Sequence, residues 1–224
     1  MNYYIKFNYN TKYLFIDVNK LLDINDKTKI KDIHISYSDF LELPDLSEFI
    51  NLESLIITNN KLKKLSDLSK CINLKYLYFT NNKLEELPDL SNLLNLCRLY
   101  CNDNKLSKLT NLPINLKILS CENNNITELN LSGLTQLEYL NISNNNIYLL
   151  PNLDIYNNLT EIYCNYNNLL SLPISILKCK KLYYYKNYKN YKNLNKLNYL
   201  LNKNIEKYYY RQILNYYFNN LIEI

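Results

Sequence analysis

The chain has 224 residues, yet it contains one glycine, one histidine, no tryptophan and no alanine. The one glycine, Gly133, excludes a glycine-rich loop that cradles phosphates, because such a loop needs several glycines at fixed offsets. The one histidine, His34, offers little material for general acid–base catalysis, and we expect it to be a solvated surface side chain. The sequence therefore predicts a protein that is not an enzyme and that carries no cofactor.

Long apolar runs are also missing, since no stretch is long enough to cross a bilayer. The first residues, MNYYIKFNYNTKYLFIDVN, lack the apolar core and the small-residue cleavage site of a signal peptide. We therefore expect a cytoplasmic protein, in the host cytoplasm if a virus encodes it. The six cysteines are then expected to be free thiols. No C-x-x-C pair or Cys/His cluster is present, so no metal site is predicted.

Asparagine is abundant, with 41 residues, and tyrosine, lysine, isoleucine and leucine supply much of the remainder. This bias is typical of an AT-rich genome that uses its simplest codons. The abundance of a residue type is therefore a weak argument for function, whereas its position within a regular pattern is a stronger one.

A regular pattern is present. The spacing L-x-x-L-x-L-x-x-N-x-L recurs with start-to-start distances of 22, 22, 22, 20, 21 and 22 residues. The seven copies begin at Ile30, Leu52, Leu74, Leu96, Leu116, Leu137 and Leu159, and the first copy has Ser38 in place of the asparagine. Positions are numbered here from the first residue of each copy. Internal repeats of this length indicate a stacked architecture.

The physical reason for the spacing is burial. Apolar residues at positions 4 and 6 are two apart, so they leave a short strand on the same side. A single copy cannot bury this apolar side alone, but copies stacked in parallel share one continuous core. The pattern therefore predicts a solenoid with a parallel sheet on one side.

These copies resemble the leucine-rich repeat family over residues 30–181. The stretch LEELPDLSNL is similar to internalin-type 22-residue units, and LTNLPINLKILSCENNNIT to the shorter units of bacterial effectors. The composition, with motifs such as LYCNDNKL, is similar to that of repeat proteins of amoeba-infecting giant viruses. The resemblance implies an α/β repeat solenoid: a curved array with a parallel concave sheet, and loops and 3₁₀ turns on the convex side.

The two ends must differ from the repeats, because open ends would expose the core. Residues 1–29 are predicted to form an N-terminal cap, with an antiparallel strand at YYIKFNY and a degenerate repeat marked by Leu14, Ile16, Asn19, Leu21 and Ile24. Residues 182–224 are predicted to form a Tyr/Lys-rich C-terminal segment. Leu182 begins a partial repeat there, and apolar residues three or four apart then indicate a helical cap.

The asparagine at position 9 recurs where the chain leaves the strand. Its amide both donates and accepts, so a stack of such side chains can satisfy turn groups that burial would otherwise leave unpaired. We therefore predict a structural asparagine ladder made of Asn60, Asn82, Asn104, Asn124, Asn145 and Asn167.

Three of the cysteines, Cys101, Cys121 and Cys164, fall at the inward position 6. Other copies carry Ile or Phe there, so these thiols are predicted to pack as small apolar residues.

Positions 3 and 5 point away from the core, and reading them down the repeats reconstructs the concave surface. Tyr76, Tyr78, Arg98 and Tyr100 become neighbours on two adjacent strands, and Ile56 lies beside them. Tyr and Arg are the residue types that most often anchor protein interfaces. The predicted partner-binding residues are Ile56, Tyr76, Tyr78, Arg98, Tyr100, Tyr139 and Tyr163.

The sequence thus favours a monomeric scaffold that binds an unidentified protein partner on its concave face. Two alternatives stay open. From residue 178 onward there are ten Lys/Arg against two Glu, so this segment could bind nucleic acid or an anionic membrane. The chain could instead be a substrate-recruiting subunit of a ligase, by analogy with bacterial repeat effectors.

Overall fold

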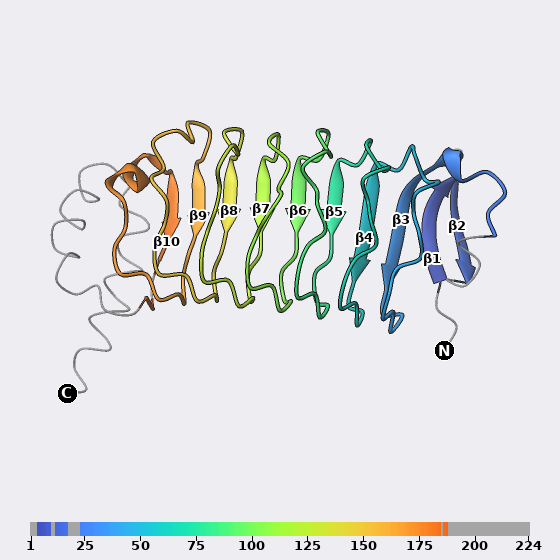
Figure 1. The fold of residues 1–224 in the computed structure, drawn as a ribbon, viewed down its shortest axis with the longest axis horizontal. Helices are drawn as coiled ribbons and strands as arrows, with labels where there is room; N and C mark the ends of the chain where they lie inside the picture. The colour runs from blue at the N-terminus through green and yellow to red at the C-terminus, as the bar shows by residue number, and fades with distance from the viewer. Residues whose placement is uncertain (1–3, 10–11, 18–22, 185, 188–224) are drawn as a thin grey trace.

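In the computed structural model, the residues described are 4–9, 12–17, 23–184 and 186–187 (Figure 1). Within them, ten strands form one sheet in the order β10-β9-β8-β7-β6-β5-β4-β3-β1-β2. The strands are β1 (Tyr4–Tyr9), β2 (Lys12–Asp17), β3 (Ile30–Ser36), β4 (Ser54–Thr58), β5 (Tyr76–Tyr78), β6 (Arg98–Tyr100), β7 (Ile118–Ser120), β8 (Tyr139–Asn141), β9 (Glu161–Tyr163) and β10 (Lys181–Tyr183). Two short 3₁₀ helices are η2 (Lys27–Lys29) and η3 (Ile174–Lys178).

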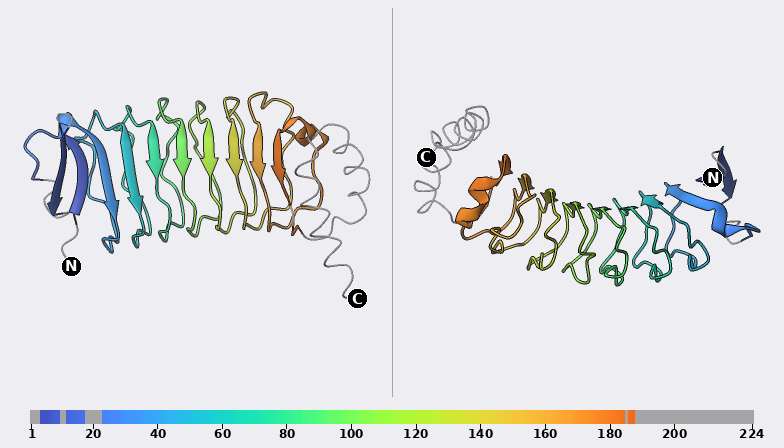
Figure 2. Two further views of the ribbon diagram at one scale, coloured as in Figure 1. Left: turned by 180° about the vertical axis from the view of Figure 1, so that it is seen from behind. Right: turned by 90° about the horizontal axis from the view of Figure 1, so that it is seen from above.

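Strands β3 to β10 pair in parallel, each with the strand of the next repeat. The register matches equivalent positions, as where Leu55, Leu77 and Leu99 lie side by side at position 4. Figure 2 shows the strands along the inner side of a shallow curve and the loops along its outer side. The predicted curved solenoid with a parallel concave sheet is confirmed.

The core runs the length of the solenoid as one cluster of buried side chains. In the second copy, Leu52, Leu55, Ile57 and Leu62 have no exposed surface. Burying a side chain of this size contributes about 1.5–3 kcal/mol to folding. Because each copy repeats the same inward positions, this contribution recurs with every turn and holds neighbouring turns together.

The turn that follows each strand has a left-handed residue at position 8. Asn59, Asn81 and Asp103 have φ values of 55°, 56° and 54°. Asn and Asp tolerate this conformation better than other residues with a Cβ, because their short polar side chains can bond locally. The left-handed backbone at position 8 therefore accounts for some of the asparagines in this chain.

At the N-terminal end, β1 lies between β3 and β2, and it pairs antiparallel with both. The antiparallel strand expected at YYIKFNY is thus β1. A degenerate repeat would have placed residues 12–17 directly against β3, in parallel. The structure instead puts β2 at the outer edge of the sheet, separated from β3 by β1.

At the C-terminal end, the last repeat begins at a different residue from the one expected. Leu182 lies in register with Ile162, which is at position 4, so Leu182 is also at position 4 and does not begin the unit. Counting back, Cys179 occupies position 1. The helical cap expected over residues 194–224 lies outside the described residues. In the part of the chain that is described, no helix is long and apolar enough to span a membrane.

Candidate functional site

The concave face of the sheet carries the residues predicted to bind a partner. Strand register places Tyr76 beside Arg98, and Tyr78 between Ile56 and Tyr100. Arg98 is exposed, and the other side chains of this group are partly exposed. The sheet therefore presents polar and aromatic side chains at outward positions, and these side chains are not part of the buried core.

The first aromatic cluster comprises Tyr76, Tyr78, Arg98 and Tyr100. The rings of Tyr78 and Tyr100 meet edge to face, with centroids 4.7 Å apart and planes at 84°. The guanidinium carbon of Arg98 lies 5.4 Å from the centre of the Tyr76 ring, within the range of a cation–π interaction. A hydrogen bond with Tyr78 raises the pKa of Arg98, and burial raises the pKa of Tyr100. The four side chains thus support one another in fixed positions.

A second aromatic cluster lies further along the face, on β8, β9 and β10. The rings of Tyr139 and Tyr163 are 5.4 Å apart, and those of Tyr163 and Tyr183 stack at 4.5 Å with an interplanar angle of 7°. Burial, followed by the charge of Tyr163, raises the pKa of Tyr139 to about 12. Lys181 and Glu161 form an ion pair of 2.8 Å beside these rings.

Tyr183 is missing from the set predicted from the sequence. The sequence contains the pattern that identifies it: Tyr183 directly follows Leu182, just as Tyr163 directly follows Ile162 in the preceding repeat. With Leu182 at position 1, as the sequence predicts, Tyr183 would fall at position 2 and off the concave face, whereas the observed register puts it at position 5.

The two clusters are separated along the sheet by Ile118 at position 3 and by Ser120 and Asn141 at position 5, so the seven predicted residues do not form one continuous patch. Among the polar groups between the clusters, the Ser120 hydroxyl donates to Asn102 Oδ1 at 2.8 Å, and Asn141 Nδ2 donates to Glu122 Oε2 at 2.9 Å. These polar groups already satisfy one another. The two aromatic clusters are therefore the better candidates for partner anchors.

The asparagines at position 9 lie under the edge of this face, inside the turn. Asn82 Nδ2 donates to the backbone oxygens of Ile57, in the preceding repeat, and Phe79, in its own, at 2.8 and 3.1 Å. Its Oδ1 accepts a bond from the Leu62 backbone N–H at 3.2 Å. Each such side chain thus ties two repeats together. The same pattern recurs at Asn60, Asn104, Asn124, Asn145 and Asn167.

The structure adds a further member, Asn187. Its Nδ2 donates to the Cys164 backbone oxygen at 3.0 Å, and its Oδ1 accepts from the Leu169 N–H at 3.1 Å. With Leu182 at position 4, Asn187 falls at position 9. Position 9 is the position of the asparagine ladder, so a repeat that begins at Cys179 predicts Asn187 as a member.

Comparisons with known proteins agree with this geometry. A family model described as "Leucine Rich repeats (2 copies)" matches residues 50–92. The repeats over residues 50–92 thus match leucine-rich repeats, and the fold is a leucine-rich repeat solenoid. No curated protein sequence matches it.

Solved structures of leucine-rich repeat proteins share the fold of this repeat protein. The functional domain of InlJ from Listeria monocytogenes is 27% identical, with a TM-score of 0.61 over 71% of this chain and 35% of that one. YopM from Yersinia enterocolitica is 28% identical, with a TM-score of 0.61 over 75% and 40%. Internalin C2 from Listeria monocytogenes, 22% identical with a TM-score of 0.64 over 82% and 81%, shows the fold alone. The chain thus spans little more than a third of the length of the first two.

The inward cysteines of the repeat array are buried and unbridged. Cys101, Cys121 and Cys164 have no exposed surface. Burial raises the pKa of Cys101 to about 12 and the pKa of Cys121 well above its usual value. The InlJ domain is described as including a cysteine ladder. Here the column is interrupted, because Ile142 lies at position 6 between Cys121 and Cys164.

His34 is part of a short hydroxyl chain on the concave face. Its Nε2 lies 2.8 Å from Ser36 Oγ, which in turn lies 2.8 Å from Thr58 Oγ1. Within the described ranges, no group of three or more His, Cys, Asp or Glu side chains is arranged to hold a metal ion. Leucine-rich repeat folds are generally interaction scaffolds rather than enzymes.

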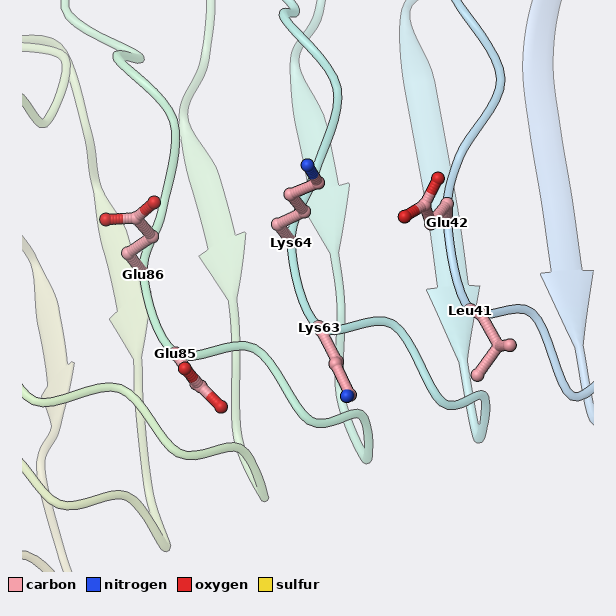
Figure 3. Close-up of a pocket in the computed structure, with 6 residues that line it drawn as sticks. All are labelled: Leu41, Glu42, Lys63, Lys64, Glu85 and Glu86. Carbon is pink, nitrogen blue, oxygen red and sulfur yellow. The ribbon is translucent and has the colours of Figure 1, made fainter.

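A hollow of about 530 Å³ lies on the loop side of the array, opposite the sheet. Figure 3 shows its lining on three consecutive loops: Leu41 and Glu42, then Lys63 and Lys64, then Glu85 and Glu86. The charge changes sign from one loop to the next. Such a surface has no strong potential of one sign to attract a charged ligand, so we place the candidate site on the concave face.

Proposed function

We propose that this chain is a non-enzymatic scaffold that binds a protein partner on its concave face. The observation that carries the proposal is the first aromatic cluster, Tyr76, Tyr78, Arg98 and Tyr100. These side chains stand on the partly exposed face of a rigid sheet, and contacts with one another already hold them in place. Aromatic and arginine anchors held in place before binding lose little conformational entropy when a partner arrives.

The fold supports this proposal, because leucine-rich repeat arrays are typical of protein interaction scaffolds and bacterial effectors. If a virus or a bacterium encodes the chain, the partner we propose is a host protein, met in the host cytoplasm. The six unbridged cysteines are compatible with a reducing compartment of that kind.

A second candidate function rests on charge. Residues 1–177 carry sixteen Lys/Arg against nineteen Asp/Glu, whereas the remainder carries ten against two. Basic side chains interleaved with tyrosine suit single-stranded nucleic acid or an anionic membrane surface. Most of this segment lies outside the described residues, so the first candidate has the stronger structural support.

The two candidates can be separated with two probes, a displayed library of short random peptides and a single-stranded oligonucleotide. Peptides selected on the full chain should bind the variants Tyr76→Ala, Tyr78→Ala and Tyr100→Ala more weakly, by about 2 kcal/mol for at least one variant. Tyr148→Ala is the matched control, because Tyr148 is half-exposed and lies in a loop segment away from the concave strands. Changes at the lysines of the C-terminal segment should matter little to these peptides.

If nucleic acid is the ligand, the order of effects reverses. Replacing Lys186, Lys189 and Lys192 by Ala should then weaken oligonucleotide binding and flatten its salt dependence, because fewer counterions are released. Tight, steeply salt-dependent oligonucleotide binding that only the lysine changes abolish would refute the concave-face proposal. Failure to select any peptide that depends on the three tyrosines would refute it as well.

A further inference from the structure

We propose that Arg98 is the anchor for an acidic side chain of the partner, so that the concave face recognises a protein segment through an Asp or Glu seated on the first aromatic cluster. This inference rests on the proposed function, because it names the chemistry of the partner at that same site.

Arginine is rare in this chain. The chain has 26 Lys and Arg residues in total, of which only Arg98 and Arg211 are arginine, which leaves 24 lysines. A composition with this bias supplies lysine wherever a generic positive charge suffices. An arginine beside the tyrosines of this cluster is therefore not what the composition alone would supply. Arginine differs from lysine in its planar fork of N–H donors, which can bind a carboxylate through two hydrogen bonds.

Arg98 differs in its charge environment from the lysines of this sheet. Three lysines on this sheet or next to its strands are already paired with acids: Lys75 with Glu53, Lys117 with Glu138, and Lys181 with Glu161. Among the described residues, no ion pair includes Arg98. Its neighbours in register are Tyr76 and Ile118, neither of which carries an acid. The guanidinium of Arg98 is thus a positive charge without an acidic partner among the described residues, and a carboxylate of the bound protein would supply one.

Aromatic side chains lie beside Arg98. The contacts of Arg98 with the Tyr76 ring and the Tyr78 side chain hold the guanidinium, yet they use only part of its five N–H donors. Tyr78 and Tyr100 form a ring pair next to it. When a partner covers such rings, water is excluded and the charge-assisted hydrogen bonds at the centre become stronger. The cluster thus has the features of an interface anchor: a charge, aromatic rings beside it and a paired sheet beneath both.

The test uses peptides selected from a displayed library of short random peptides on the full chain, with Arg98→Gln, Arg98→Lys and Arg98→Glu as variants. Selected peptides should share an Asp or Glu, and Arg98→Gln should weaken them at least about tenfold. Arg98→Lys should recover only part of the loss, because a lysine cannot form the paired hydrogen bonds. Lys117→Gln is the control for loss of a positive charge at the edge of the sheet, and it should have little effect.

A charge exchange isolates the contact. Arg98→Glu should bind the original peptide more weakly still, and replacing the peptide's acidic residue by Arg should restore binding to that variant but not to the unchanged chain. Circular dichroism melting of each variant should match the unchanged protein, because Arg98 is exposed and lies outside the core.

Three results would overturn the inference, and they differ from one another. Peptides that need Tyr76 and Tyr100, but tolerate both Arg98→Gln and replacement of their own acidic residues by amides, would leave the concave-face function standing and remove the acidic anchor. Displacement of the peptides by inorganic phosphate, with no requirement for Asp or Glu, would replace the carboxylate by a phosphate. Selection of no peptide that depends on the tyrosines would remove the proposed function and this inference together.

Discussion

Asn104 and Phe79 belong to neighbouring repeats, yet the side chain of the first is bonded to the backbone of the second. Asn104 Nδ2 donates to the Phe79 oxygen at 2.9 Å, while Asn104 Oδ1 accepts from the Leu84 N–H at 2.9 Å. These two groups come from either side of the turn in the preceding repeat. One side chain therefore closes a turn and joins two repeats, and its repetition makes the edge of the concave sheet rigid.

Removal of one of these asparagines should destabilise the fold although the apolar core is unchanged. Asn82→Ala and Asn104→Ala each leave turn groups without partners, which should lower the free energy of unfolding by about 1–3 kcal/mol. Urea unfolding followed by circular dichroism measures this loss. Asn125→Ala is the control, because Asn125 is an exposed asparagine at position 10. Equal stability of all three variants would contradict the structural role.

The backbone at Tyr37 predicts a stabilising substitution. Tyr37 has φ of 54° and a side chain that is 74% exposed, so it adopts the left-handed conformation without burying its ring. Asn tolerates this conformation better, and Tyr37→Asn should raise the free energy of unfolding by about 0.5–1 kcal/mol.

The control for Tyr37→Asn is Tyr148→Asn, because Tyr148 is half-exposed but lies outside the left-handed region. It should bring no such gain. A decrease in melting temperature for Tyr37→Asn alone would show that its exposed ring contributes more than the backbone costs.

The buried thiols predict a loss of stability in alkaline solution. In the unfolded chain a thiol ionises near pH 8.5, whereas burial raises the pKa of Cys101 to about 12 and that of Cys71 to about 11. Above the unfolded value, the unfolded state binds fewer protons than the folded state. Each such thiol should therefore lower the free energy of unfolding by about 1.4 kcal/mol per pH unit from there up to its folded pKa.

Comparison with Cys101→Val tests this origin, because valine fills a similar space and does not titrate. Between about pH 8.5 and 10, stability of the variant should fall less steeply than that of the unchanged protein, by about 1.4 kcal/mol per pH unit. Parallel curves for the two proteins would show that Cys101 does not contribute to the alkaline loss.

A reducing agent should not change the melting temperature, because all six cysteines are unbridged. Protein isolated without reductant should melt at the same temperature before and after it is added, and six thiols should react once the chain is denatured. A large fall on reduction would indicate a structural bridge, with Cys101 and Cys121 the first pair to examine, since they lie at the same inward position of adjacent repeats.

The sequence by itself determined the repeat, its parallel stacking and the inward and outward faces of each strand. The reason is that each repeat of a solenoid contacts only the adjacent repeats. A residue's neighbours on the sheet are therefore the residues about 22 positions before and after it in the sequence. Thus Tyr78 beside Tyr100, and Asn82 inside the turn, followed from position alone.

Only the tertiary structure decided the ends and the contacts between side chains. β1, rather than β2, pairs with β3. Either strand could complete the hydrogen bonds at the edge of β3, and no repeat spacing specifies which one does so. Leu182 is at position 4 because β10 pairs with β9 in that register, although its own spacing also allowed position 1. The separation of the tyrosines into two clusters, and the position of Arg98 without a carboxylate, depend on which side chains meet across strands. Strand spacing brings such side chains within reach, but their packing selects the contacts they make.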